Sequence, residues 1–106
     1  MINYNDFSKL DLKIAKIKKA EDHPNANKLV VLTIDVGDEE KQIVAGIRQH
    51  YTNKELKGKE IVIVNNLEPV TLRGVESNGM LLAASDGDKI VLLQPDKEVT
   101  PGAGVK

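Results

Sequence analysis

Cysteine and tryptophan are absent from the sequence. Without thiols the chain can form no disulfide, no thiolate nucleophile and no sulfur-ligated metal site, and a small domain of this kind suits the reducing cytoplasm. The two histidines, His23 and His50, lie far apart, and His23 precedes Pro24 in a pattern typical of a turn. We therefore predict no catalytic residue, no metal site and no cofactor, so the protein is not expected to be an enzyme.

Aromatic side chains are nearly as scarce, and the only ones are those of Tyr4, Phe7 and Tyr51. The core is therefore expected to be aliphatic. Proteins that bind single strands by base stacking need several exposed rings, which so few aromatic residues cannot supply. Any contact with nucleic acid is expected to rest on lysine, arginine and amide groups.

Long hydrophobic runs are also missing. The apolar stretch 28–36 is interrupted and far shorter than the roughly 20 residues of a membrane helix. The N-terminal MINYNDFSKL lacks the apolar centre of a signal peptide. We expect a soluble cytoplasmic protein with no membrane partner. A length of 106 residues predicts a single domain over residues 1–106, with no room for a separate catalytic domain.

The formal net charge is only −1, which argues against a uniformly basic coat for DNA. Basic residues are unevenly distributed, since residues 1–28 hold six lysines and four acidic residues. Lys16 and Lys18 share one face of an expected strand, and a bulge would bring Lys13 toward the same groove, where ammonium groups follow a phosphate backbone. The alternative is a solvated strand face.

Strand signals dominate the middle of the chain, where β-branched residues cluster between turn formers. The alternation shifts near Ala15 and Lys16, which predicts a long strand with a bulge over residues 11–20. Thr52 and Glu55 form a capping-box pattern, so one short helix is predicted over residues 53–57. Further strands are expected over residues 29–36, 41–45, 61–64, 79–84 and 90–93, followed by an extended tail over 94–106.

This order of elements predicts the OB-fold, an all-β, five-stranded Greek-key barrel with one short helix between the third and fourth strands. An extra C-terminal strand or extended tail completes the prediction. An SH3-like barrel is the main rival. Apolar residues in 90–93 and in the tail exceed what five strands and a helix can enclose, which predicts a homodimer.

Two stretches carry candidate binding residues. HPNANKL, residues 23–29, joins two expected strands through a rigid proline and amide side chains that can donate and accept hydrogen bonds. LRGVESNGM, residues 72–80, offers Arg73 for a phosphate or a guanine edge, the hydroxyl of Ser77, and glycines that let backbone approach a ligand. Met80 either rests against a base or fills the core.

The order and spacing of five segments resemble those of the tRNA-binding domain family: DLKIAKI, HPNANKL, IVAGI, NLEPVTLRGVESNGMLLAASDG and LLQPDKEVTPGAGV. The family includes the C-terminal appendage or separate β subunit of methionyl-tRNA synthetases, free-standing bacterial tRNA-binding proteins and cofactors such as the endothelial monocyte-activating polypeptide. Ala15 and Asn27 depart from its pattern, where glycine and aspartate are usual.

The resemblance implies an OB-fold module that binds tRNA with little sequence preference, has no catalytic activity and forms a homodimer. For a β subunit it also implies the catalytic subunit of methionyl-tRNA synthetase as a partner. A chaperone-like homodimer of the same fold that binds polypeptides is the alternative. The residues assigned to tRNA on this basis are Lys13, Asn25, Lys28, Arg73, Ser77, Gly79 and Met80, of which Arg73 is added on charge and position.

Overall fold

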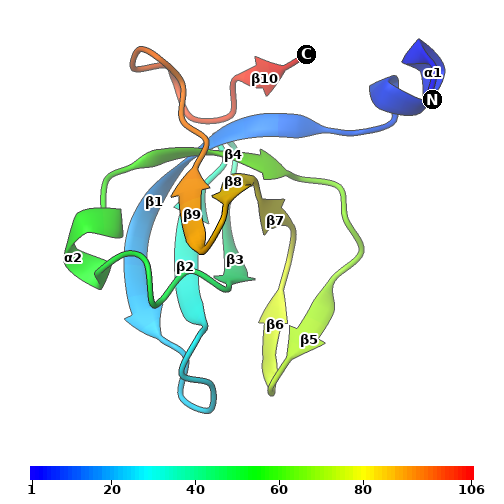
Figure 1. Ribbon diagram of the computed structural model, residues 1–106. Helices are drawn as coiled ribbons and strands as arrows, with labels where there is room; N and C mark the ends of the chain where they lie inside the picture. The colour runs from blue at the N-terminus through cyan, green and yellow to red at the C-terminus, as the bar shows by residue number, and fades with distance from the viewer.

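The computed structural model describes residues 1–106, which form a curved main sheet, two outlying hairpins and two short helices (Figure 1). The helices are α1 (Tyr4–Ser8) and α2 (Asn53–Leu56). The strands of the main sheet are β1 (Leu12–Asp22), β2 (Val30–Asp35), β3 (Glu40–Ala45), β4 (Glu60–Val64), β7 (Met80–Leu81) and β10 (Gly104–Val105). The two hairpins comprise β5 (Val70–Leu72) with β6 (Val75–Ser77), and β8 (Ala83–Asp86) with β9 (Lys89–Leu92).

The main sheet runs in the order β3-β2-β1-β4-β7, all neighbours being antiparallel. The two ends of this order approach each other, because the amide of Asn78 donates to the carbonyl oxygen of Gln42 on β3 at 2.8 Å. Lys41 closes the same seam by donating from Nζ to the backbone and side-chain oxygens of Asn65, both at 2.9 Å. The result is the predicted OB-fold barrel, nearly closed and built from five main strands.

β1 is long enough to pair with β2 along one half and with β4 along the other. Its bulge lies between Ile17 and Lys19, not at Ala15 and Lys16 as the alternation suggested. Ala15 and Ile17 both face the core, so the alternation is intact there. The extra residue is accommodated at Lys18, where β1 turns away from β4.

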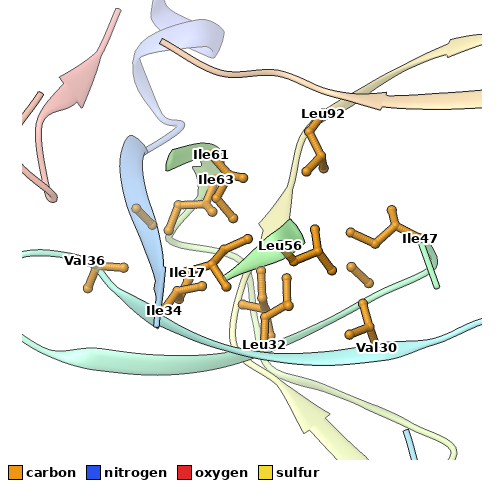
Figure 2. Packing of buried hydrophobic residues seen from close by; sticks show 13 residues of the cluster. Ile17, Val30, Leu32, Ile34, Val36, Ile47, Leu56, Ile61, Ile63 and Leu92 are labelled. Atoms are coloured by element: carbon orange, nitrogen blue, oxygen red, sulfur yellow. The ribbon is translucent and has the colours of Figure 1, made fainter. Parts of the chain in front are cut away.

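The barrel interior is aliphatic, as the composition required (Figure 2). Isoleucine, leucine and valine side chains from β1, β2, β3 and β4 interdigitate, and Leu56 of α2 and Leu92 of β9 are added to them. Ala15 is fully buried in this cluster, so the small residue at this position of β1 leaves room for its larger neighbours.

Both helices begin with a capping box. In α2, Thr52 and Glu55 exchange side-chain to backbone hydrogen bonds, which confirms the expected helix. The first helix, α1, was not expected. Its signal is the same box in a weaker form, because Asn3 accepts from the amide of Asp6 at 2.9 Å while Asp6 replaces the usual glutamate.

The sequence pattern also missed the β5–β6 hairpin and joined two separate strands into one. The expected strand over 79–84 is divided, with β7 in the main sheet and β8 in a hairpin with β9. The tail is extended as predicted, and its β10 pairs with the start of β1. Gly102 makes this docking possible, because a Cβ there would lie 2.6 Å from the carbonyl oxygen of Val36.

Candidate nucleic-acid interface

A surface hollow of about 400 Å³ lies between the β1–β2 loop and the tip of the β5–β6 hairpin. Two cationic side chains border it, Lys28 from the loop and Arg73 from the hairpin, and both are exposed. No acidic residue lines the hollow, so the site favours an anionic ligand. Its lining residues are Asn25, Ala26, Asn27, Lys28, Leu29 and Arg73.

Asn25 and Arg73 hold the two sides of this hollow together (Figure 1 shows the loop and the hairpin tip at the same end of the molecule). Arg73 Nη2 donates to the carbonyl oxygen of Asn25 at 3.2 Å, and Asn25 Nδ2 donates to the carbonyl oxygen of Arg73 at 3.4 Å. Arg73 has a φ of 53° and Gly74 a φ of 90°, which makes the tight turn of the hairpin. The remaining guanidinium donors of Arg73 are free to bind a phosphate.

His23 makes a second bridge between the same two segments. Its ring is buried, its Nε2 lies 2.9 Å from the carbonyl oxygen of Leu72, and its Nδ1 accepts from the amide of Asn25 at 2.9 Å. The sequence suggested only a turn residue here. A histidine before a proline carries no signal for a partner on a distant hairpin, so sequence reasoning missed its role.

Arg48 supports the loop from the segment that follows β3. Its Nη1 donates to the carbonyl oxygen of Ala26 at 3.3 Å and its Nη2 to Oδ2 of Asp22 at 3.0 Å. Asp22 also accepts from Asn53 Nδ2 at 3.0 Å, which connects the loop to α2. Three separate parts of the chain therefore fix the conformation of the loop.

Ser77 and Gly79 lie at the base of the hairpin, away from the hollow. The hydroxyl of Ser77 is buried, accepts from the amide of Val44 at 2.9 Å and donates to the carbonyl oxygen of Gly79 at 3.0 Å. Gly79 has a φ of 115°, and a Cβ there would lie 3.0 Å from the carbonyl oxygen of Val64. The close approach expected of Gly79 is therefore made to β4 of its own barrel.

Met80 is 48% exposed, so it is not a core residue. In the sheet it forms a row with Val64 and Leu12 on the face opposite to the barrel interior. Exposure leaves its thioether side chain available to a ligand.

Lys13 is not part of the hollow. It lies near the start of β1 opposite Ile63 and Gly104, whereas the loop follows the end of β1. At about 3.3 Å per residue, the strand separates Lys13 from Asp22 by roughly 30 Å along its length. The structure thus brings together Asn25, Lys28 and Arg73 but leaves Lys13 at the other end of the strand.

Lys16 and Lys18 do lie together, in a hollow of about 450 Å³ between β1 and the C-terminal tail. Lys13 is not among its lining residues, so the row of three lysines is not formed. Lys59 and Lys97 add two further cations, but four carboxylates balance them, namely Asp35, Glu60, Asp96 and Glu98. A balanced set of charges gives no preference for phosphate.

The neighbouring Lys19 is paired with Glu21 on the same strand. The side-chain hydrogen bond that Lys19 donates to Glu21, together with the negative charge of Glu21, raises the pKa of Lys19. Lys19 is exposed and paired with Glu21, and it does not line the hollow.

Elsewhere in the structure no three histidine, aspartate or glutamate side chains come close enough to hold a metal ion. None of the helices is long and apolar enough to cross a membrane. The topology and the exposed loop site define an OB-fold binding module.

Comparison with known proteins makes this more specific. Residues 12–104 match the family model described as "Putative tRNA binding domain". The chain belongs to this tRNA-binding domain family, as its motifs indicated.

Similar curated proteins include methionine–tRNA ligases. The ligase of Thermococcus kodakarensis is 52% identical over 105 residues, which are 99% of this chain and 14% of that protein. The ligase of Thermotoga maritima is 58% identical over 104 residues, 98% of this chain and 16% of that protein. The chain therefore spans about a seventh of the length of the relatives it matches.

Solved structures of similar size share the whole fold. A crystal structure of a MetRS-related protein from Pyrococcus horikoshii superposes with a TM-score of 0.94 at 39% identity, covering 100% of this chain and 98% of that one. The chaperone CsaA from Bacillus anthracis superposes with a TM-score of 0.91 at 34% identity, covering 100% and 99%. The fold thus occurs both in a MetRS-related protein and in a protein described as a chaperone.

Proposed function

We propose that this chain binds tRNA through the hollow between the β1–β2 loop and the β5–β6 hairpin, and that it performs no reaction of its own. The observation that carries the proposal is the pairing of Lys28 and Arg73 in a site without acidic residues, within a tRNA-binding domain. Two cations that border one hollow can both contact phosphates of a backbone, and amides of the loop add hydrogen bonds.

The seven residues assigned to tRNA have different parts in this proposal. Asn25, Lys28 and Arg73 contact the backbone directly, and Met80 offers an exposed apolar surface to a base or sugar. Ser77 and Gly79 do not contact tRNA in this proposal, and they support the site by holding the base of the β5–β6 hairpin against β3 and β4. Lys13 makes a separate phosphate contact, because a tRNA is much longer than the roughly 30 Å that separate the two ends of β1.

Salt dependence of binding to unfractionated tRNA tests the proposal. Three neutralised phosphates give a slope of log K against log salt of roughly −2 to −3. Binding should differ little between purified tRNA species, because phosphate contacts carry no sequence information. A flat salt titration, or binding to one species alone, would contradict the proposal.

The place of the module in the cell follows from its relatives. We propose that it raises the tRNA affinity of a methionyl-tRNA synthetase in the cytoplasm, either as a β subunit or as an appended domain. A second binding site on the enzyme increases the overall affinity without new contacts at the first. Co-purification with the synthetase from the source cell, and a lower KM for tRNA when the chain is present, are the expected results.

We also propose that the chain forms a homodimer, since large apolar side chains remain uncovered. The apolar segment 90–93 was one basis for predicting a dimer. Within it Leu92 is buried, whereas Val91 and Leu93 are 47% and 42% exposed. A second exposed pair, Leu10 and Leu67, is brought together by Asn66, which hydrogen-bonds to the backbone of Lys9 and Asp11.

Sedimentation equilibrium at micromolar concentration should return twice the mass of the chain. Val91→Glu and Leu67→Glu each place a charge in one exposed pair, so the variant that dissociates identifies the pair used by the dimer. A monomer in the unsubstituted chain would contradict the proposal.

Polypeptide binding is a second candidate, which the likeness to the chaperone CsaA favours. The exposed apolar side chains are compatible with it. A competition experiment between bulk tRNA and an unfolded polypeptide separates the two functions. The tRNA proposal predicts that polypeptide does not displace labelled tRNA, and efficient displacement would favour the chaperone-like function.

A further inference from the structure

His23 is the one buried ionisable side chain of the protein, 3% exposed, at the junction of the β1–β2 loop and the β5–β6 hairpin. Its hydrogen bonds determine its protonation state. The amide of Asn25 can only donate, so Nδ1 accepts and carries no proton. The carbonyl oxygen of Leu72 can only accept, so the ring proton is on Nε2. The bond at Nδ1 requires a neutral imidazole, whereas the bond from Nε2 can form in either protonation state.

A second proton on this ring would break the hydrogen bond that His23 accepts from Asn25. It would have to enter at Nδ1, where it would face the amide hydrogen of Asn25 across 2.9 Å. Two donors cannot share that space, so the loop would have to move away from the ring. Asn25 is also the residue that is bonded to Arg73, and the displacement would therefore reach the hollow itself.

The charged groups around His23 do not compensate for an added charge. Arg73 lies on the hairpin, Arg48 follows β3, and Lys28 belongs to the loop, so three cations surround the junction. The carboxylate of Asp22 at the end of β1 already accepts from Arg48 at 3.0 Å and from Asn53 at 3.0 Å. No hydrogen bond joins it to the His23 ring.

We propose that neutral His23 is the positioning residue that holds Asn25 and Arg73 in the geometry that binds tRNA, and that its protonation releases the loop and weakens binding. This inference rests on the proposed function of the hollow.

The direction of the pH effect distinguishes this proposal from ordinary electrostatics. On acidification a protein takes up protons and becomes more positive, which strengthens its contacts with phosphates. Loss of the bond between His23 and Asn25 acts in the opposite sense. Weaker tRNA binding at lower pH therefore cannot come from net charge.

The experiment compares tRNA affinity at pH 7.5 and pH 5.5, at constant ionic strength, in three proteins. We expect the unsubstituted chain and His50→Gln to lose about five- to tenfold in affinity at the lower pH. His50 is exposed, which makes its replacement a matched control. His23→Gln keeps a donor for Leu72 but cannot titrate, so its affinity should be constant or rise on acidification.

Nuclear magnetic resonance of the free protein provides a readout that needs no tRNA. The ring nitrogens of His23 should show an unprotonated Nδ1 and a protonated Nε2 at pH 7.5, and the amide of Asn25 should lose protection from exchange as the ring titrates. A different tautomer, or protection of Asn25 that is unchanged at pH 5.5, overturns the inference even if His23→Gln is too unstable to assay.

The outcomes separate this inference from the proposal beneath it. Salt-sensitive tRNA binding that stays constant or tightens at pH 5.5 overturns the role of His23 alone. Equal pH profiles for His23→Gln and the unsubstituted chain do the same. No tRNA binding at any pH overturns the proposed function together with this inference.

Discussion

The buried hydroxyl of Ser77 accepts a hydrogen bond from the backbone amide of Val44 at 2.9 Å. This bond joins the base of the β5–β6 hairpin to β3, where the barrel would otherwise have an unpaired donor. Ser77→Ala removes the acceptor and leaves that amide buried, so we expect a loss of about 1–3 kcal/mol in the free energy of unfolding. Chemical denaturation measures it, with Ser85→Ala on the exposed β8 as the control. Unchanged stability with weaker tRNA binding would instead assign the hydroxyl to the ligand.

Removing either cation of the hollow should weaken tRNA binding without changing stability. Lys28→Ala and Arg73→Ala should each reduce affinity by a similar factor for all tRNA species and make the salt slope shallower by about 1. The exposed Lys89 lies in the β8–β9 hairpin, away from the hollow, so Lys89→Ala is the control for lost positive charge. An equal effect from Lys89→Ala would mean that net charge, and not this site, determines the affinity.

The substitution Met80→Ala distinguishes a surface contact from a packing role. Because Met80 is 48% exposed, the free energy of unfolding should change by less than about 1 kcal/mol, whereas a core methionine would cost roughly 2–5 kcal/mol. The affinity for tRNA should fall. A denaturation curve and a binding titration on the same variant provide both numbers, and lost stability with unchanged affinity would refute the assignment.

Gly79 should tolerate substitution less well than another glycine of similar conformation. Gly79 and Gly58 both have positive φ, 115° and 92°, so alanine strains the backbone at each. At Gly79 the new Cβ would also lie 3.0 Å from the carbonyl oxygen of Val64, whereas at Gly58 nothing lies within 4 Å. Thermal denaturation should therefore show a larger drop in Tm for Gly79→Ala, and equal drops would show that β4 moves aside.

Much of the barrel could be predicted from local pattern. Apolar, β-branched runs between turn formers identified the strands β1 to β4 to within a few residues, because such side chains favour extended, half-buried backbone. The capping box of Thr52 and Glu55 identified α2 by the same local logic. The hairpin β5–β6 gave no such signal, since its strands have three residues each and lie outside the main sheet.

The binding site could be predicted as a set of residue types but not as an arrangement. Asn25, Lys28 and Arg73 carry recognisable chemistry, yet 48 positions of sequence separate Asn25 from Arg73, and only the closed barrel brings them together. The same folding places Lys13 at the far end of β1 and turns the hydroxyl of Ser77 inward.

The sequence by itself therefore determined the strand pattern, the aliphatic core and the family, because each depends on residues that are close in the chain or on motifs in a fixed order. The tertiary structure alone decided which side chains share a surface. It paired His23 with Leu72, 49 positions away, and balanced Lys16 and Lys18 with carboxylates from the tail. Contacts of this range depend on sheet register and closure, which local periodicity does not encode.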